Sequence, residues 1–342
     1  MKLALKSSFI LLIVFFIYFG VSSQFTFKPK WFLDYLNPMA ASLRQFHLDL
    51  VNPPITYDLA YFQGKWYAPW GLLPALLLIP AQIVLGRYVP AIYLSLFLAS
   101  LNVLIMYYLL LRLRKEFFPQ LSQLGIWLVL VMFAFGTAHF YVGTLGGVWH
   151  VEQMVSTFLG VLGFAVIFRQ KRQIRHYVIA TILFGLALLA RATVSLMVVL
   201  PFSLYFWEHI LQQQAVGARI RSIKRALVIF GVPLMILMSL FFWYNYLRFN
   251  DPFEYGFNYI QEAPYLEQLR QSSGIRSLAN VPRNLWYMVG EIPSLSWEKH
   301  PILRFNLNGN SIFFLTPPLL AIFLALPITK IKGKWQWHPY LA

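Results

Sequence analysis

Long apolar runs separated by short polar segments dominate this chain. Nine runs stand out, at about 7–23, 70–86, 89–111, 123–141, 151–168, 177–190, 193–211, 226–246 and 311–328. Most of them approach the roughly 20 residues that a helix needs to cross the hydrocarbon core of a bilayer. The pattern therefore predicts an all-α polytopic membrane protein.

Composition supports this prediction, because 59% of the 342 residues are hydrophobic and only 12% are charged. The chain has no cysteine, which excludes disulfides, thiolate chemistry and Cys-based metal sites. It also has no nucleotide-binding glycine loop, no HExxH motif and no GxSxG motif. Any catalysis must therefore use carboxylates, basic groups and aromatic surfaces.

The net charge of +16 comes largely from short basic clusters between the apolar runs. Sixteen of the 28 basic residues fall in five clusters: Lys2 and Lys6; Arg112, Arg114 and Lys115; Arg169, Lys171, Arg172 and Arg175; Arg219, Arg221, Lys224 and Arg225; Lys330, Lys332 and Lys334. Cytoplasmic loops retain lysine and arginine, so all five clusters are expected on the cytoplasmic side. The excess charge indicates topology, and we expect no nucleic-acid partner.

If all clusters share one side, each interval between them must contain an even number of spans. The first interval contains three runs, and 70–86 is the weakest because Pro74 and Pro80 interrupt it. We therefore predict an interfacial helix there and eight spans in all, with both termini cytoplasmic. A cleaved signal peptide at 7–23 is an alternative.

The predicted organisation is a single membrane domain over 1–342. It comprises a first span (1–23), an external loop with juxtamembrane helices (24–88), a transmembrane bundle (89–246), a second external loop (247–310) and a last span with a cytoplasmic tail (311–342). A longer natural chain that continues past 342 is left open.

Three acidic residues are the candidates for catalysis. Asp34 closely follows the first span, Asp58 borders an aromatic segment, and Glu152 opens a later span two residues after His150. A solvated loop residue or a helix cap is the alternative for the two aspartates, and a simple interfacial carboxylate is the alternative for Glu152. A joint metal site of His150 and Glu152 is not favoured, because residues two apart on a helix point to different sides.

Three external cations are candidates for binding an anionic group. Arg191 lies between two apolar runs with no acidic residue nearby in sequence, so an anionic partner is expected, or else snorkelling to headgroups. Arg248 has the same placement, with Asp251 and Glu254 as the alternative partners. Lys65 lies in the aromatic segment and offers a point charge to a phosphate.

The aromatic segment YDLAYFQGKWYAPWG, residues 57–71, contains Trp66, Tyr67 and Trp70. Such residues are common in the interfacial belts of membrane proteins, which need no function to explain them. They also pack against sugar rings, so the segment is a candidate sugar or lipid contact together with His150. Both interpretations remain open at this point.

The order of several motifs resembles the GT-C superfamily of membrane glycosyltransferases. The segments that carry this resemblance, within about 1–260, are LDYLNPMAASL, DLAYFQGKWYAPWGLLPALLLIP, FGTAHFYVGTLGGVWHVEQ, GLALLARATVSLMVVLP and NYLRFNDPFEYGF. They are most similar to the protein-O-mannosyltransferase and aminoarabinose-transferase branch and to its RgtA/B/C/D-like bacterial relatives. In that superfamily two juxtamembrane helices join the first two true spans.

The resemblance implies transfer of a sugar from a polyprenyl-phosphate donor to a glycan, lipid or protein acceptor at the external face of a bacterial plasma membrane. It implies that Asp34 is the catalytic base or a metal ligand, that Glu152 is a second acid, and that Lys65 and Arg191 lie near the lipid phosphate. Tyr35 follows Asp34 where many relatives have an acidic pair, which leaves the need for a divalent cation undecided. The alternatives are a transporter or flippase of lipid-linked glycans, or a non-catalytic membrane protein that binds lipid-linked sugar.

Overall fold

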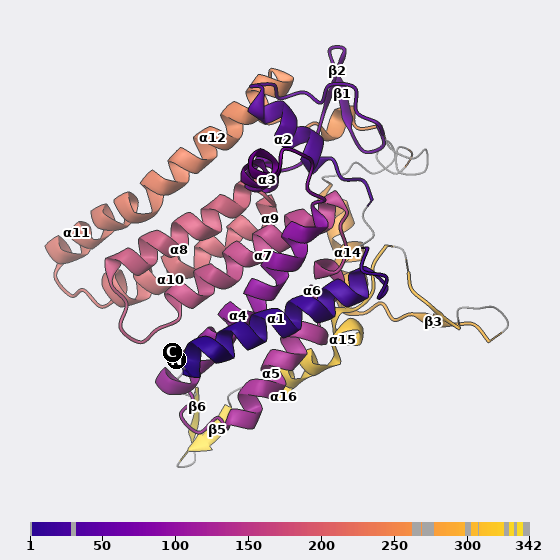
Figure 1. The fold of residues 1–342 in the computed structure, drawn as a ribbon. Coiled ribbons are helices and arrows are strands. Elements are labelled where there is room, and N and C mark those ends of the chain that lie inside the picture. Colours follow the sequence, from indigo (N-terminus) through magenta and orange to yellow (C-terminus); the bar gives the residue numbers. More distant parts are fainter. Residues whose placement is uncertain are drawn as a thin grey trace. The chain divides into compact units, whose positions relative to one another are not determined.

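The computed structural model describes residues 2–28, 32–261, 268, 277–297, 302–306, 308–324, 328–331 and 334–337, and most of them are helical (Figure 1). The chain divides into two compact units. The first unit comprises Met1–Ala134 with His139–Gln261, and the second comprises Phe135–Ala138 with Glu262–Ala342. All the candidate residues lie in the first unit.

Among the residues described, five helices are long and apolar enough to cross a membrane. They are α1 (Lys2–Ser22); α4 (Ile92–Glu116); α7 (Val148–Ile167); the run of α9 (Ala192–Ser195), η2 (Leu196–Val198), α10 (Val199–Tyr205) and η3 (Phe206–Leu211); and the run of α11 (Val216–Ala226), η4 (Leu227–Gly231) and α12 (Val232–Phe249). An integral membrane protein built from helices is therefore supported, whereas the predicted eight spans are not confirmed.

The three remaining predicted spans are shorter or interrupted. The run 123–141 forms α5 (Gln123–Phe135) and α6 (Ala138–Gly143), and 177–190 lies in α8 (Ile174–Leu186) and η1 (Ala187–Leu189). The run 311–328 is divided into α15 (Ile312–Leu315), η7 (Pro317–Leu320) and α16 (Ala321–Leu324), with 325–327 outside the described residues. Adjacent prolines at the start of η7 explain this division, because proline lacks the amide donor and clashes with the preceding turn.

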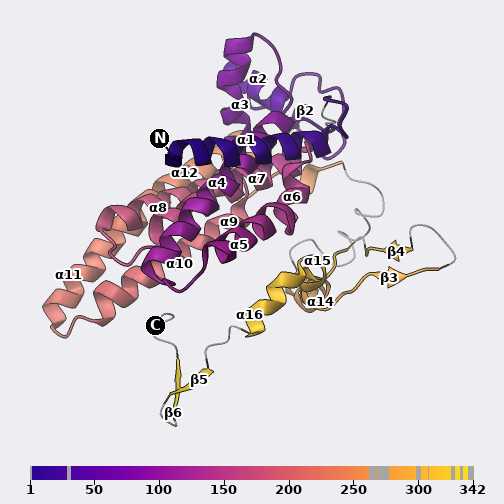
Figure 2. The same cartoon turned by 60° about the horizontal axis from the view of Figure 1, so that its bottom comes forward.

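The run 70–86 forms α3 (Leu72–Leu85), which at 14 residues is shorter than any of the spanning helices. Pro80 lies inside it, and Gly86 ends it in the left-handed conformation with φ of 63°. α3 packs against α2 (Leu36–Arg44). Figures 1 and 2 show α3 crossing the bundle helices instead of running alongside them. This arrangement agrees with the predicted juxtamembrane helices.

The aromatic segment contains a β-hairpin that the sequence analysis did not predict. Strands β1 (Ala60–Phe62) and β2 (Lys65–Tyr67) pair in antiparallel fashion. The two turn residues, Gln63 and Gly64, have φ of 49° and 79°, which suits a tight two-residue turn. The short helix η5 (Phe257–Tyr259) lies near the C-terminal end of the first unit, and the residue after it, Ile260, forms a β-bridge with Ala60. This bridge joins the hairpin to the end of the first unit.

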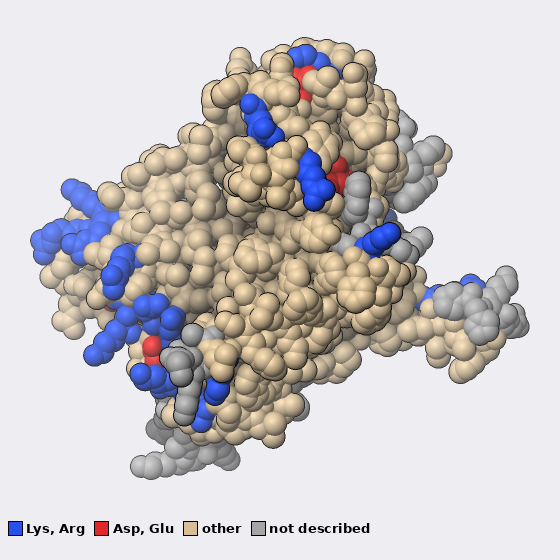
Figure 3. Space-filling view, in the orientation of Figure 1, with Lys and Arg blue, Asp and Glu red and all other residues tan. Residues whose placement is uncertain are grey.

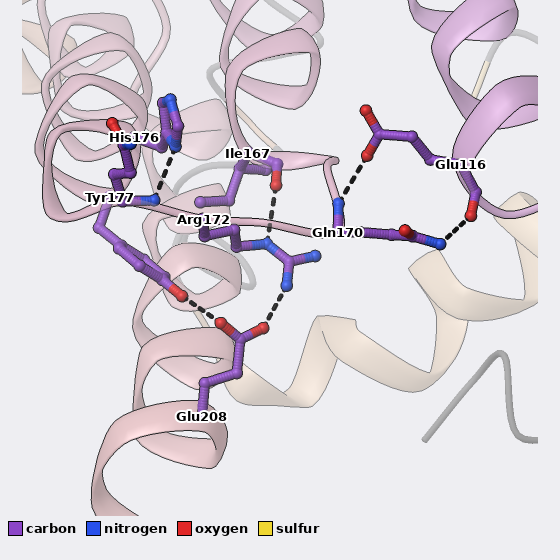
Figure 4. Close-up of polar contacts among 8 residues, drawn as sticks. Glu116, Ile167, Gln170, Arg172, His176, Tyr177 and Glu208 are labelled. Atoms are coloured by element: carbon purple, nitrogen blue, oxygen red, sulfur yellow. Dashed lines mark hydrogen bonds and ion pairs between the residues drawn. The ribbon is translucent and has the colours of Figure 1, made fainter.

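Four of the five basic clusters meet at one end of the bundle, which we call the basic end. Glu116 of α4 accepts a hydrogen bond from the Gln170 amide at 2.6 Å, and Arg172 pairs with Glu208 of η3 (Figure 4). Ser7 of α1 contacts Tyr108 of α4 near the same end. Figure 3 shows lysine and arginine gathered there, around α11. The fifth cluster belongs to the second unit.

The opposite end of the bundle, which we call the loop end, contains 32–91, 148–152, 187–192 and 245–261. The spanning helices α4 and α7 run between the two ends and are the most enclosed, with half or more of each helix buried. Helix α7 begins at the loop end directly after Gly147, whose backbone is extended with ψ of 151°. This start places the first turn of α7 beside the loops.

The second unit has little regular structure among its described residues. Its further elements are η6 (Leu278–Asn280), α14 (Val281–Val289), β3 (Ser294–Leu295), β4 (Leu303–Arg304), β5 (Ile328–Ile331) and β6 (Lys334–Trp337). Glu291 joins two parts of this unit, because it accepts hydrogen bonds from Trp286 Nε1 and Asn306 Nδ2, both at 2.8 Å.

Candidate functional site

A carboxylate and a guanidinium from two different helices meet at the loop end. Glu152, in the first turns of α7, has a side chain that is only 4% exposed, and its Oε2 lies 3.6 Å from a guanidinium nitrogen of Arg191. Arg191 precedes α9 and is 41% exposed. Sequence proximity offered Arg191 no acidic partner, but the fold supplies Glu152. The anionic partner expected for Arg191 is therefore, within the fold, a carboxylate of the protein itself.

Gly71 completes the surroundings of this pair. Its amide donates to Glu152 Oε1 at 2.7 Å, a charge-assisted hydrogen bond. A Cβ atom on Gly71 would lie 2.4 Å from the carbonyl oxygens of both Leu189 and Ala190. The φ of −66° suits any residue, so close approach, not conformational freedom, requires glycine here. The backbone at Gly71 and the segment just before α9 therefore approach each other closely beside Glu152.

Aromatic residues adjoin this pair in the chain, because Trp70 precedes Gly71, and Trp149 and His150 precede Glu152. Tyr35 stacks on Trp70 with ring centroids 5.0 Å apart, Trp70 meets Trp149 edge-on at 6.5 Å, and Phe32 lies 6.0 Å from the His150 ring. We call these five side chains the aromatic wall. His150 is close enough to Arg191 for their charges to interact. Its Nδ1 is buried, with no hydrogen-bond partner among the described residues.

Asp34 lies in the same loop, but its carboxylate points to two helix starts. Oδ2 accepts from the Ala91 amide at 3.0 Å and from Asn37 Nδ2 at 2.7 Å, and Oδ1 accepts from the Asn37 amide at 3.2 Å. Asn37 Oδ1 in turn accepts from Gln82 Nε2 at 2.9 Å and from the Val89 amide at 3.1 Å. This geometry fits a helix cap that joins α2, α3 and α4.

Burial raises the pKa of the Asp34 carboxyl, because desolvation disfavours the ionised form, while the hydrogen bonds from Ala91 and Asn37 act in the opposite direction. A carboxyl with a raised pKa holds a proton more readily than an ordinary aspartate. That property suits a group that accepts a proton during a reaction. The surroundings of Asp34 are therefore compatible both with a helix cap and with a catalytic base.

Arg248 is buried at the end of α12 with 4% of its surface exposed. It donates to the Ala68 carbonyl at 2.7 Å and to Asn245 Oδ1 at 2.8 Å, and its guanidinium carbon lies 3.9 Å from the centre of the Tyr244 ring. It takes part in none of the ion pairs found among the described residues. Asp251 and Glu254, the partners considered from the sequence, form no close ion pair with Arg248, although Glu254 is near enough for their charges to interact.

The other predicted site residues lie around the hairpin. Lys65 is exposed and its Nζ lies 3.4 Å from Asp49. Trp66 packs on Tyr61 with centroids 4.6 Å apart, and Tyr67 packs on Phe249 at 5.3 Å.

Asp58 is half-buried, and its charge reaches Tyr35. Burial, followed by the charge of Asp58, raises the pKa of the Tyr35 phenol to about 12. Asp58 therefore affects the aromatic wall through Tyr35, while Lys65 is held at the hairpin by Asp49.

Sequence reasoning missed three residues that shape this site: Gly71, Asn37 and Trp149. Gly71 precedes an apolar helix start, which is a usual place for a cap, so nothing in the sequence marks its close contact with Leu189 and Ala190. Asn37 was detectable, because an aspartate three residues before a polar side chain at a helix start is a capping pattern.

Comparison with known proteins found no match for this chain among protein-family models, curated proteins or solved structures. Within the described ranges, no three His, Asp or Glu side chains converge to hold a metal ion. The function must therefore be inferred from the residues at the loop end.

Proposed function

We propose that this protein is a glycosyltransferase that moves a sugar from a polyprenyl-phosphate donor to an acceptor at the external face of the membrane. The observation that carries the proposal is the Glu152–Arg191 pair beside the aromatic wall. A charged pair at the edge of spanning helices is costly unless it has a use, and intramembrane charges often mark sites of function.

Arg191 is the residue to which we assign the donor phosphate. At 3.6 Å its contact with Glu152 is an ion pair longer than a hydrogen bond, and 41% of the side chain is exposed. A guanidinium has five N–H donors in a planar fork that matches phosphate oxygens. Glu152 then acts as a positioning residue, because it holds the arginine at the mouth of the site without occupying all of its donors.

Within the aromatic wall Phe32 is exposed and Trp149 and His150 are half-buried, so these rings offer faces against which a sugar packs, whereas Tyr35 and Trp70 are buried behind them. Arg248 holds the neighbouring Ala68 carbonyl in place, and Lys65 on the hairpin offers a second, exposed cation. These features agree with an enzyme that recognises a phosphate and a sugar without a nucleotide. They also agree with the resemblance described above.

In the proposed reaction a carboxylate takes the proton of the acceptor hydroxyl as its oxygen bonds to the anomeric carbon. The bond between that carbon and the phosphate oxygen breaks, and the polyprenyl phosphate leaves with the bonding electron pair. Arg191 stabilises the charge that develops on the phosphate. We assign the base to Asp34, whose raised pKa favours proton uptake.

The reaction is assigned to the external face because the basic end is expected in the cytoplasm. The loop end, with Glu152 and Arg191, then faces outward. Polyprenyl-phosphate donors present their sugars to this face in the class of enzyme that the motifs resemble.

The test is mass spectrometry of surface glycans and lipid-linked sugars in a deletion strain complemented with variants. With Arg191→Gln we expect accumulated polyprenyl-linked donor and a truncated acceptor, as in the deletion strain itself. Arg44→Gln is the matched control, because Arg44 is also an exposed arginine of the loop region. Unchanged glycans in the deletion strain would refute transfer, and donor trapped on the cytoplasmic face would favour a flippase instead.

A further inference from the structure

An apolar groove of about 770 Å³ runs between the last two spanning runs of the first unit. One wall comes from η2, α10 and η3, including Leu196, Val199 and Phe206, and the other from η4 and α12, including Leu227 and Met238. All five of these side chains are exposed. The volume is within the roughly 300–1,000 Å³ typical of ligand sites, so the groove is more than an ordinary gap between side chains.

Both walls change to π-helix near the basic end of the groove, at Phe206–Leu211 and at Leu227–Gly231. Short π-helical segments inside helices often occur at functional sites. Gly231 lines the groove at this level, and a Cβ atom placed on it would meet nothing within 4 Å. The groove is therefore open at the point where the π-helical segments face it.

Helix α11 continues the second wall toward the basic end and carries four cations: Arg219, Arg221, Lys224 and Arg225. All four are exposed, and none takes part in the ion pairs found among the described residues. Ile223 of the same helix lines the groove. Apolar lining and unpaired positive charge thus lie on one helix.

Three other arginines of the basic end are already engaged within the protein. Arg112 donates to the Ala165 carbonyl, Arg169 to the Val166 carbonyl at 3.0 Å and Arg172 to the Ile167 carbonyl at 2.9 Å, so that these three cap the C-terminus of α7. Arg172 also pairs with Glu208, as Figure 4 shows. Within the described part of the chain the cations of α11 have no carboxylate partner, and of the four only Arg219 donates to a backbone carbonyl, that of Gln213 at 3.0 Å.

The length of the run formed by α11, η4 and α12 places the cations of α11 outside the hydrocarbon core of the membrane. The run Val216–Phe249 has 34 residues, which at about 1.5 Å per residue corresponds to roughly 51 Å. The hydrocarbon core measures about 30 Å. With α12 anchored at the loop end through Arg248, α11 must extend into the headgroup region on the basic side.

We propose that the groove and α11 together bind an anionic phospholipid of the leaflet at the basic end. An acyl chain lies in the groove, and the headgroup phosphate is held by the cations of α11. Basic clusters that directly adjoin a membrane helix attract anionic lipids at about 1 kcal/mol per residue. A donor phosphate held by Arg191 lies at the opposite end, so this site is independent of the proposed transfer reaction.

The charge arm of the test uses purified protein in detergent with phosphatidylglycerol as the anionic probe and phosphatidylcholine as the neutral one. Native mass spectrometry measures how much of each lipid stays bound. We expect Arg219→Gln with Arg225→Gln to weaken phosphatidylglycerol binding roughly 25-fold, at about fivefold for each cation. The control pair, Arg44→Gln with Arg87→Gln, removes the same charge from exposed positions at the loop end and should change nothing.

The groove arm uses Gly231→Leu, which fills the open space without a clash of its Cβ. Leucine also favours helix over glycine, so folding should be preserved. We expect at least a tenfold loss of phosphatidylglycerol binding. The control is Gly217→Leu on α11, where a Cβ atom meets only the end of the Arg221 side chain, at 3.9 Å.

Three outcomes would overturn the proposal. Equal loss in the two arginine pairs would show unspecific attraction to net positive charge. Unchanged binding in Gly231→Leu would show that the lipid touches only the surface of α11. Displacement of phosphatidylglycerol by a polyprenyl phosphate whose own binding ignores Arg219 and Arg225 would assign the groove to the donor chain. Helix content and a single size-exclusion peak check that each variant is folded.

Discussion

Replacing Gly71 by alanine is the sharpest single test of how the loop end is assembled. A methyl group there would lie 2.4 Å from two backbone carbonyl oxygens, those of Leu189 and Ala190. Backbone carbonyls cannot rotate away as the end of a flexible side chain can. The loop must therefore move away from the start of α9, and the Gly71 amide must move away from Glu152.

The magnitude follows from two contributions. Overpacking a well-packed contact costs about 1–3 kcal/mol, and loss of a hydrogen bond to a charged group costs about 1.5–3 kcal/mol. We therefore expect Gly71→Ala to reduce stability by about 2.5–6 kcal/mol. At roughly 2 °C per kcal/mol for a chain of this size class, the apparent melting temperature should fall by at least about 5 °C.

The assay is thermal unfolding of purified protein in one detergent at one scan rate, followed by size-exclusion chromatography with fluorescence detection. Gly160→Ala in α7 is the control, because its Cβ would make only ordinary contact with Val194 at 3.8 Å and alanine favours helix. A melting temperature of Gly71→Ala equal to or above that of the wild type would refute the close contact on which the site geometry depends.

Three further predictions concern topology, catalysis and the buried arginine. Because the chain has no cysteine, Gln63→Cys should react with an impermeant thiol reagent from outside and Gln214→Cys only after the membrane is opened; the reverse pattern would invert the orientation. Asp34→Asn should lower turnover per folded protein by roughly 10² or more while Asp49→Asn leaves it nearly unchanged, and equal effects would remove Asp34 as the base. Arg248→Met should destabilise by about 2–4 kcal/mol in the same thermal assay, since two acceptors lose a charged donor, whereas an unchanged melting temperature would show that the guanidinium does not hold the loop.

The sequence predicted the helical class and the shared end of four of the five basic clusters, because both depend on composition over many residues. The predicted eight spans are not confirmed, because three of the runs are shorter or interrupted among the described residues. The proline criterion that removed 70–86 also applies to Pro317 and Pro318, which divide 311–328 into short pieces. The run 123–141 is interrupted in a different way, since α5 ends at Phe135 and only the short α6 follows.

The site was predictable only in part, because its contacts join distant segments. The residue types at Glu152 and Arg191 were recognised, but their pairing depends on how α7 packs against the chain before α9. The contact of Arg248 with the backbone carbonyl of Ala68 was not predictable, because a carbonyl has no sequence signature. The capping geometry of Asp34, by contrast, depends on local contacts within the loop and was open to prediction.

The three arginines that cap α7 bear on how the protein is made. Arg112 is synthesised before α7, and Arg169 and Arg172 directly after it, so the exposed carbonyls of this helix have their donors as soon as the segment leaves the ribosome. Glu208 follows later and pairs with Arg172. The basic residues that are expected to orient the nascent chain thus also donate to the C-terminal carbonyls of α7. A substitution that removes these arginines would therefore affect both the orientation of α7 in the membrane and the hydrogen bonds at its C-terminus.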